Sequence, residues 1–394
     1  MQQQSGLQLP DPDADSQAHT ARVTAYLRSK IAAAGGQISF AEYMHEALYA
    51  PGLGYYSAGS TKFGAAGDFV TAPEVSPVFG AVLARQCATV IAGIDGASIL
   101  EFGAGSGRLA VDVLRTLARL ETLPERYRIV EVSADLRERQ ESLLNSEIPE
   151  LVERVNWLDG LPGRHAGVVI ANEVLDALPV ERFVRRADGV YQACVALAED
   201  RFVWTERPAT DALAAAVVAL EDDIERELPD GFTSEICLAA APWIAAIGAM
   251  IDEGIAFLFD YGVNRHEYYA ADRSTGWLRC HFRHHAHNDA LILTGIQDLT
   301  SWVDFSMVAT AAHDNGFEIA GFVNQAQFLM AGGLDAELAD IAELPPAAQL
   351  ELSRQVKLLT LPGEMGENFK CLGLRRGDVT TPGAFLVADR TTTL

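Results

Sequence analysis

The stretch Ser98–Arg108, with the sequence SILEFGAGSGR, limits the folds open to this chain more than any other segment. Its first residues are typical of a buried strand. Gly103, Gly105 and Gly107 then alternate with other residues before a helical pattern begins at Leu109. Glycine lets the backbone turn tightly and approach a ligand closely, and a helix N-terminus presents amide N–H groups. This order of elements predicts a site for a nucleotide or an adenosyl compound, although ordinary turns also contain such glycines.

Apolar strand-like runs alternate with helical patterns along much of the chain, at residues 98–101, 127–132, 155–158, 167–171 and 255–259. Continuous apolar strands separated by helices indicate a parallel sheet that is buried on both faces. The predicted fold class is therefore α/β, with a doubly wound sheet. Two further strands are expected at Phe317–Val323 and Phe369–Leu374.

Helices are predicted where apolar residues recur with helical spacing, at 21–34, 40–49, 75–93, 109–120, 211–220 and 239–251. Between the fourth and fifth strands of the sheet, three short runs at 180–184, 191–197 and 202–206 predict an antiparallel meander. Asp188-Gly189 and Glu199-Asp200 supply its turns.

The segment Pro51–Gly80 is too rich in glycine and proline for a regular element. Long loops inside globular proteins are usually functional or disordered, and the aromatic residues of this one argue against disorder. We expect a loop that covers a ligand, with a packed connector as the alternative.

The formal charge is −24, from 54 acidic and 30 basic residues. Nucleic acids and anionic membranes bind basic surfaces, so this balance argues against both as partners. The five cysteines are scattered, which favours reduced thiols. No apolar run is long enough to cross a bilayer, and the N-terminal residues lack the features of a signal or transit peptide. We therefore expect a cytoplasmic protein without membrane insertion.

Polar residues stand where the predicted strands end, and parallel strands bind ligands at their carboxyl ends. Glu131 lies at the tip of the second strand, where a carboxylate can accept hydrogen bonds from both hydroxyls of a ribose. Glu101 precedes the glycine loop and is expected to orient it or to pair with a ligand ammonium group. Trp157 and Leu158 follow the third strand and could flank an adenine.

The run Ala171–Pro179, ANEVLDALP, places Asn172, Glu173 and Asp176 at the expected start of a short helical turn. Acids at such a position can simply complement the helix dipole. The alternative that we favour is an active-site role, in which they hold a cationic or hydroxylated substrate.

Further polar residues are expected on the substrate side of the site: Asp260, Tyr261, Gln297 and Asp298. The stretch Leu278–His287 contains His281, His284, His285 and His287, and we expect a cationic, mobile loop there. A metal site is disfavoured because no acid-bearing helix pattern accompanies these histidines, so no metal is predicted.

Several of these segments together resemble the MidA-like family of class I S-adenosylmethionine-dependent methyltransferases: PGLGYYS (51–57), FGAAGDFVTAPEVSPVFG (63–80), LEFGAGSGRL (100–109), ANEVLDALPV (171–180), FDYG (259–262), GIQDLTSWVDFS (295–306) and PGEMGENFK (362–370). The resemblance runs from about Ala21 to Leu374. It implies a Rossmann-like core with a central, mostly parallel seven-stranded sheet, an N-terminal extension of helices and loops, and an inserted β-rich subdomain.

The predicted segments are a disordered tail (1–18), N-terminal helices with a cofactor-covering loop (19–95), the first part of the core (96–179), the inserted subdomain (180–238) and the second part of the core with substrate-side loops (239–394). The resemblance implies S-adenosylmethionine as cofactor. Its methionine part would bind the glycine loop and its ribose would bind Glu131. The cofactor-contacting residues would include Gly67, Asp68, Thr71 and Glu74 of the covering loop, and Asn172.

Mitochondrial members of the family are arginine methyltransferases that assist the assembly of respiratory complex I. The resemblance therefore implies a protein substrate, with a respiratory complex subunit as a candidate, and Glu173 and Asp176 as acids that grip the arginine. A homodimer is also expected. Three alternatives stay open: a non-catalytic adenosyl-binding assembly factor, a small-molecule methyltransferase and an NAD-dependent dehydrogenase.

Overall fold

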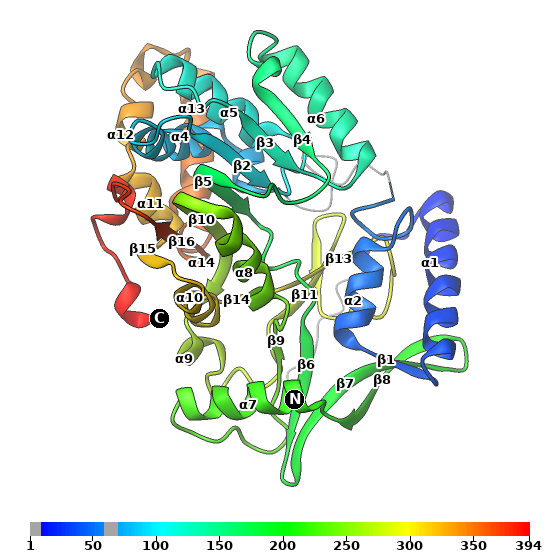
Figure 1. The fold of residues 1–394 in the computed structure, drawn as a ribbon. Helices are drawn as coiled ribbons and strands as arrows, with labels where there is room; N and C mark the ends of the chain where they lie inside the picture. The colour runs from blue at the N-terminus through cyan, green and yellow to red at the C-terminus, as the bar shows by residue number, and fades with distance from the viewer. Residues whose placement is uncertain (1–8, 59–69) are drawn as a thin grey trace. The chain divides into compact units, whose positions relative to one another are not determined.

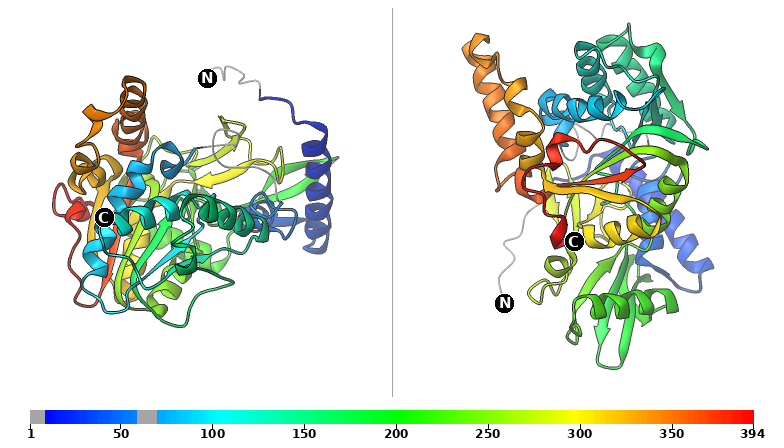
Figure 2. Two further views of the ribbon diagram at one scale, coloured as in Figure 1. Left: turned by 90° about the horizontal axis from the view of Figure 1, so that it is seen from above. Right: turned by 60° about the vertical axis from the view of Figure 1, so that its left-hand side comes forward.

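A computed structural model describes residues 9–58 and 70–394, and Figures 1 and 2 show its ribbon. The chain divides into two compact units, and the described part of each combines three segments. The segments of unit 1 are 9–58, 177–240 and 265–302, and those of unit 2 are 70–176, 241–264 and 303–394. The predicted inserted segment, 180–238, falls within unit 1, whereas the predicted segments 19–95 and 239–394 contribute to both units.

Unit 2 contains an eight-stranded sheet in the order β15-β16-β10-β5-β2-β3-β4, with β14 beside β10. Its strands are β2 (Ser98–Phe102), β3 (Tyr127–Val130), β4 (Val155–Leu158), β5 (His165–Asn172), β10 (Ile251–Val263), β14 (Val303–Asp304), β15 (Glu318–Asn324) and β16 (Phe369–Arg376). Strands β4, β3, β2, β5 and β10 are parallel, and β16 runs antiparallel to both β10 and β15. The prediction of a mostly parallel sheet is confirmed.

Both faces of this sheet are buried. Successive side chains of a strand point to opposite faces, yet Ile99 and Leu100 of β2 are each 0% exposed, as are Phe257 and Leu258 of β10. Helices must therefore cover the sheet on two sides, as the continuous apolar runs predict. On one face, Phe102 packs its ring against Trp243 of α8 (Ala240–Met250), with ring centroids 5.3 Å apart.

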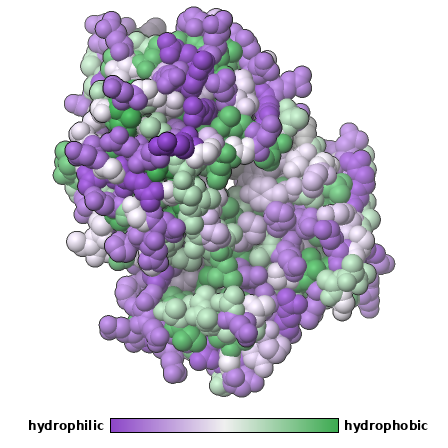
Figure 3. All heavy atoms as spheres, in the orientation of Figure 1, coloured by the Kyte–Doolittle hydropathy of each residue, from purple (hydrophilic) through white to green (hydrophobic). Residues whose placement is uncertain are grey.

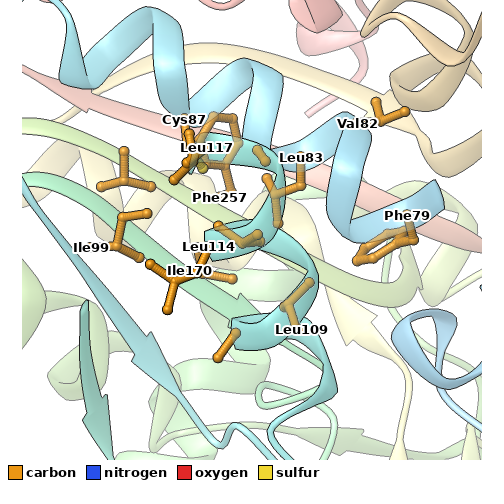
Figure 4. Close-up of a cluster of buried hydrophobic side chains, with 14 of the residues drawn as sticks. Phe79, Val82, Leu83, Cys87, Ile99, Leu109, Leu114, Leu117, Ile170 and Phe257 are labelled. Carbon is orange, nitrogen blue, oxygen red and sulfur yellow. The ribbon is translucent and has the colours of Figure 1, made fainter. Parts of the chain in front are cut away.

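The opposite face packs against α4 (Pro77–Ile91) and α5 (Arg108–Arg119). Figure 4 shows this core, in which the helices and the sheet contribute Phe79, Val82, Leu83, Cys87, Leu109, Leu114, Leu117, Ile99, Ile170 and Phe257. The other helices of unit 2 are α3 (Ala72–Val75), α6 (Ala134–Glu147), α10 (Phe305–Asp314), α11 (Gln325–Ala331), α12 (Leu334–Glu337), α13 (Pro346–Thr360) and α14 (Met365–Asn368). Short 3₁₀ turns occur at Val152–Arg154, Ile341–Glu343, Gly383–Phe385 and Thr391–Thr393.

The helix predicted at 75–93 is divided into α3 and α4. Ser76 between them is extended, with φ −161° and ψ 139°, because a residue that precedes proline is pushed out of the helical region. Its hydroxyl also accepts a hydrogen bond from the N–H of Val78 at 3.4 Å, as a helix cap does.

Unit 1 contains an antiparallel sheet in the order β1-β7-β6-β9, in which β8 also pairs with β7. Its strands are β1 (Gln37–Ser39), β6 (Glu181–Arg186), β7 (Gly189–Ala198), β8 (Arg201–Pro208) and β9 (Thr233–Ile236). Its helices are α1 (Ala14–Ala33), α2 (Phe40–Tyr49), α7 (Asp211–Asp223) and α9 (Arg265–Tyr268). The meander predicted from the sequence corresponds to β6, β7 and β8.

Helix α1 begins at Ala14, inside the segment predicted as a disordered tail and seven residues before the helical pattern is evident. The side chain of Asp13 accepts a hydrogen bond from the N–H of Ser16 at 2.8 Å. This N-cap, together with the acidic Asp15 in the first turn, stabilises the start of a helix whose first residues are mostly polar.

The histidine-rich stretch forms a β-hairpin, not the mobile loop that we expected. Its strands β11 (Leu278–Phe282) and β12 (His285–His287) pair with each other, and β11 also pairs with β13 (Asp298–Ser301). The two residues between the strands, Arg283 and His284, have φ values of 47° and 63°, which a two-residue hairpin turn requires.

Within the described part of the chain, no helix is long and apolar enough to cross a membrane. On the face drawn in Figure 3, hydrophilic residues predominate where helix α6 lies.

Candidate active site

The candidate site lies in unit 2, at the edge of the sheet where β2, β3, β4, β5 and β10 end. The carboxyl ends of parallel strands meet at one edge, and ligands of open α/β sheets bind there. The predicted cofactor and catalytic residues that the structure describes all belong to unit 2. Gly67 and Asp68 lie outside the described residues.

The glycine loop connects β2 to α5, and its three glycines have φ values of 61°, 54° and 88°. A side chain is disfavoured at these positions because the left-handed backbone is strained for other residues. Space is also limited: a Cβ at Gly103 would lie 3.3 Å from Cγ2 of Val174. The helix cap Gly107 has no side chain to occupy the N-terminus of α5. The loop therefore provides a backbone-lined cradle.

Glu101, the last but one residue of β2, is buried beside the loop. It is 2% exposed, and its Oε2 accepts a hydrogen bond from the hydroxyl of Tyr127 at 2.8 Å. Burial raises the pKa of Glu101 to about 7, and the neighbouring Glu131 adds to this effect, whereas the Tyr127 hydrogen bond opposes it. Of the two roles predicted for Glu101, this geometry favours support of the loop.

Glu131 directly follows β3 and is 7% exposed. Its Oε1 accepts a hydrogen bond from the N–H of Ser133 at 2.9 Å, and its Oε2 accepts one from Nε2 of Gln140 at 3.2 Å. Burial raises the pKa of Glu131, and both hydrogen bonds oppose this shift by favouring the carboxylate. The next residue, Val132, is apolar and 81% exposed.

Trp157 and Leu158, at the end of β4, are half-buried. The indole N–H of Trp157 donates to Oε1 of Gln140 at 2.8 Å. Arg137 of α6 donates to the carbonyl of Leu158 at 2.8 Å and to that of Glu131 at 2.6 Å. Exposed apolar side chains here, above all Val132, give this end of the sheet a surface suited to a flat aromatic group.

Helix α3 is joined to the glycine loop by a hydrogen bond from the hydroxyl of Ser106 to the carboxylate of Glu74. Thr71 is the N-terminal flanking residue of α3 and makes no side-chain cap. The predicted covering-loop residues Thr71 and Glu74 thus lie on a segment of unit 2 that contacts the glycine loop.

The run Ala171–Pro179 does not begin a helix. Strand β5 continues to Asn172, and Glu173 then has a φ of 54°, a left-handed conformation that a glutamate rarely adopts. The N–H of Glu173 donates to the carbonyl of Phe259 at 2.8 Å, and Nδ2 of Asn172 donates to Oε1 of Glu173 at 3.2 Å. Such strain persists only where the surroundings enforce it, and it is common at functional sites.

Asp260 holds this turn from the neighbouring strand β10. Its carboxylate, 0% exposed, accepts hydrogen bonds from the N–H groups of Leu175 at 2.9 Å, Asp176 at 3.1 Å and Tyr261 at 3.0 Å. Burial raises the pKa of Asp260 well above its usual range, and the negative charges of Asp176 and Glu173 add to the shift.

Asp176 is also buried, at 5% exposed, and its Oδ2 accepts a hydrogen bond from the hydroxyl of Tyr261 at 2.6 Å. Glu173 is more exposed than either aspartate, because it is half-buried. Of the three acids, Glu173 is therefore the one that a ligand can reach most easily.

The other two predicted substrate-side residues belong to unit 1 and have contacts there. Gln297 is 1% exposed, and its Nε2 donates to the carbonyl of Ala290 at 3.0 Å. Asp298 is 2% exposed and accepts a hydrogen bond from the hydroxyl of Tyr56 at 2.9 Å. Gln297 holds the loop before β13, and Asp298 joins the start of β13 to Tyr56; their assignment to the substrate side stays a prediction.

The residues at the site that were not predicted from the sequence include Gln140 and Val132. Gln140 and Leu144 are the only fully buried residues of α6, and they lie four positions apart on one face. A polar residue on the apolar face of a helix is the signal that could have identified Gln140. Among residues 9–58 and 70–394, no group of three or more His, Cys, Asp or Glu side chains is arranged to hold a metal ion.

Comparison with known proteins agrees with this geometry. A model of a family of S-adenosyl-L-methionine-dependent methyltransferases matches residues 82–323. The mitochondrial protein arginine methyltransferase NDUFAF7 of Danio rerio is 31% identical over 378 residues, with 88% of this chain and 85% of the relative covered. Its counterpart in Mus musculus is 30% identical over 374 residues, with 86% and 81% covered.

A crystal structure of a Burkholderia thailandensis protein bound to S-adenosyl-homocysteine has a TM-score of 0.92 and is 40% identical. The matched region covers 98% of this chain and 100% of the Burkholderia thailandensis chain. The predicted fold class is thereby confirmed. The dehydrogenase alternative receives no support from these relatives.

The expected cytoplasmic location is wrong by the same comparison, because the relatives from Danio rerio, Mus musculus and Drosophila melanogaster are named as mitochondrial proteins. Scattered, unpaired cysteines indicate a reducing environment, and an acidic composition indicates solubility. Neither property distinguishes one reducing compartment from another.

Proposed function

The chain belongs to the family of S-adenosyl-L-methionine-dependent methyltransferases that its sequence resembles, and on that premise we propose that it methylates an arginine side chain of a protein. The names of the curated relatives support arginine as the acceptor. The observation that carries the proposal is the half-buried, conformationally strained Glu173 at the end of β5, in the same unit as the glycine loop and Glu131.

The residues present fit S-adenosyl-L-methionine. Glycines with left-handed backbone leave space for the methionine part, and the Glu131 carboxylate is an acceptor for the two ribose hydroxyls. Trp157, Leu158 and the exposed Val132 offer apolar surface to the adenine. Thr71, Glu74 and Asn172 are assigned to the rim of the same site, and Gly67 and Asp68 to the covering loop.

When bound, S-adenosyl-L-methionine supplies an electrophilic methyl group that an acceptor nitrogen can displace in line. The protein contributes mainly alignment and exclusion of water to such a reaction. The Glu173 carboxylate would bind the guanidinium and direct one nitrogen toward the methyl group, and the Asn172 amide would orient that carboxylate through its 3.2 Å hydrogen bond. A nitrogen that gains a methyl group loses a proton, and Glu173 is the carboxylate beside it that can accept this proton.

Asp176 has a different role from Glu173 in this proposal. Oδ2 of Asp176 accepts the hydrogen bond of the Tyr261 hydroxyl, so Asp176 does not itself form a bidentate contact with the substrate guanidinium. Instead, it contributes negative charge close to Glu173. Asp260 fixes the turn that carries both acids.

The acceptor is proposed to be a protein, with a subunit of a respiratory complex as the candidate that the family resemblance implies. A homodimer is proposed separately.

The test is methyl transfer from radiolabelled S-adenosyl-L-methionine into a mitochondrial extract, followed by mass spectrometry of the labelled species. We expect label in methylarginine of a protein. The variant Glu173→Gln should lower the rate about 100-fold, because it removes the charge that binds and deprotonates the guanidinium. Label only in small molecules, or in protein residues other than arginine, would contradict the proposal. Glu351→Gln, which alters an exposed acid on α13, is the matched control and should retain the wild-type rate.

A further inference from the structure

Gln140 of α6 occupies a junction between three parts of the candidate cofactor site. Its side chain is 0% exposed. Nε2 donates to the carbonyl of Gly105 at 3.0 Å and to Oε2 of Glu131 at 3.2 Å, and Oε1 accepts the indole N–H of Trp157 at 2.8 Å. One amide thus contacts the glycine loop, the acid after β3 and the tryptophan at the end of β4.

The chemistry of this junction requires an amide. A primary amide has two N–H donors and one carbonyl acceptor, and here each donor and the acceptor has a partner. A glutamate could accept from Trp157, but it would place a second negative charge beside Glu131. A leucine could fill the space, but it would leave the buried Glu131 oxygen and the indole N–H without this partner.

The glycine loop also packs directly on this residue. A Cβ at Gly107 would lie 3.3 Å from both Cα and Cγ of Gln140. The loop, α6 and the two strand ends therefore form one connected arrangement.

We propose that Gln140 is a positioning residue for the cofactor, which holds the glycine loop, Glu131 and Trp157 in their ligand-binding arrangement before the ligand arrives. Gln140 acts through these partners and does not itself need to touch the ligand. The inference rests on the proposed function for the identity of the cofactor, but not for the identity of the methyl acceptor. Preorganisation of this kind increases affinity because less order must be created on binding.

The hydrogen bond to Glu131 predicts a specific pH effect. Only the carboxylate of Glu131 can accept from both ribose hydroxyls, so affinity should fall as the pH drops through the pKa of Glu131. Burial raises that pKa, and the Gln140 donor, the N–H of Ser133 and the charge of Arg137 on α6 oppose the shift. The carboxyl of Glu101 on β2 also faces Glu131 and is coupled to it by charge repulsion. Removal of the Gln140 donor should therefore move the midpoint of the affinity profile to higher pH.

The experiment is calorimetric titration of the full chain with S-adenosylhomocysteine between pH 5 and pH 9. Gln140→Leu should weaken binding about 10-fold at the alkaline end of this range, and by a larger factor toward its acidic end, because the raised pKa of Glu131 rises further without the Gln140 donor. Gln86→Leu is the matched control, because Gln86 is another buried amide of unit 2, which donates to the carbonyl of Gly332 at 2.7 Å and accepts from the N–H of Ala384 at 3.0 Å. It should lower the melting temperature but keep the wild-type affinity and pH midpoint.

A second variant covers the case in which Gln140→Leu does not fold. Trp157→Phe keeps a half-buried aromatic ring but removes the N–H that binds Gln140, and it should weaken binding a few-fold. Equal affinity of wild type and both site variants at every pH would overturn the inference, as would an equal loss of affinity in Gln86→Leu. A wild-type protein that does not bind S-adenosylhomocysteine would instead contradict the assigned cofactor, and a protein that binds it but transfers no label would contradict only the proposed reaction.

Discussion

The two halves of the strand-end edge in unit 2 hold their buried acids by different means. At the ends of β2 and β3, Glu101 and Glu131 accept hydrogen bonds from the side chains of Tyr127 and Gln140, and Glu131 accepts one more from the main-chain N–H of Ser133. At the end of β10, Asp260 accepts three hydrogen bonds from main-chain N–H groups. An acid that accepts only main-chain N–H groups determines the path of the backbone, whereas an acid that also accepts a side-chain donor from another element is oriented by that element.

This difference indicates that the two sides of the edge have different functions. The Asp260 side of the edge uses a buried carboxyl group to form a turn, and the turn carries Glu173. The Glu131 side uses α6 to orient an acid toward the space in which we place the ribose. Each of the following predictions concerns a variant on one side of the edge, and the measurement shows whether the other side is affected.

The largest effect is expected for Asp260→Ala. This variant leaves three main-chain donors without their acceptor, so it should lower the free energy of unfolding by roughly 3–5 kcal/mol. Chemical denaturation measures the loss. Asp260→Asn keeps one acceptor oxygen and should recover much of the stability. Folded Asp260→Ala protein should still bind S-adenosylhomocysteine, and a complete loss of binding would show that the two sides are not separable.

A second effect concerns the pH dependence of stability. Burial raises the pKa of Glu101 to about 7 from an ordinary value of 4.5, so the folded state binds a proton more tightly than the unfolded state. Glu101 then contributes a loss of stability as the pH rises from about 4.5 to 7, amounting to about 3 kcal/mol in total. Glu101→Gln carries no such charge, and its stability relative to wild type should increase over this pH range.

Denaturation curves of the two proteins at pH 5 and pH 8 measure this difference. Tyr127→Phe removes the donor that opposes the shift, so it should steepen the pH dependence. If the free energies of wild type and Glu101→Gln differed by the same amount at both pH values, the assignment of the raised pKa would be wrong.

Glu131→Gln should change the free energy of ligand binding by a smaller amount, which is easy to measure. The amide keeps the shape of the side chain but loses the charge-assisted hydrogen bonds to ribose, so the Kd for S-adenosylhomocysteine should rise about 100-fold. Isothermal titration measures this change. Glu173→Gln serves as the comparison from the other side and should leave the Kd within twofold. An equal rise in both variants would contradict the proposed difference in function.

The architecture of unit 2 could be predicted from the sequence because the signals are local. Strands such as β5 and β10 are continuous apolar runs, and the glycine loop marks the junction between β2 and α5. The polar residues that follow these strands could be placed at one edge, since parallel strands end on the same side.

The supporting contacts could not be predicted in the same way. Gln140 lies on a mostly polar helix, and its partners Gly105 and Trp157 come from other elements. The left-handed backbone of Glu173 depends on the carbonyl of Phe259 and on the turn that Asp260 holds, and neither contact leaves a pattern in the local sequence. The hairpin at Arg283 and His284 was missed because its turn lacks the glycine or asparagine that usually supplies positive φ.

The backbone of Glu173 has a consequence for how this position tolerates change. A residue with a side chain loses about 1 kcal/mol in the left-handed region relative to glycine. If stability alone decided the amino acid, position 173 would be glycine, and the chain would gain by losing the carboxylate. Selection for thermostability should therefore favour loss of the Glu173 side chain, and a stabilised variant obtained without an activity screen should be sequenced at this position.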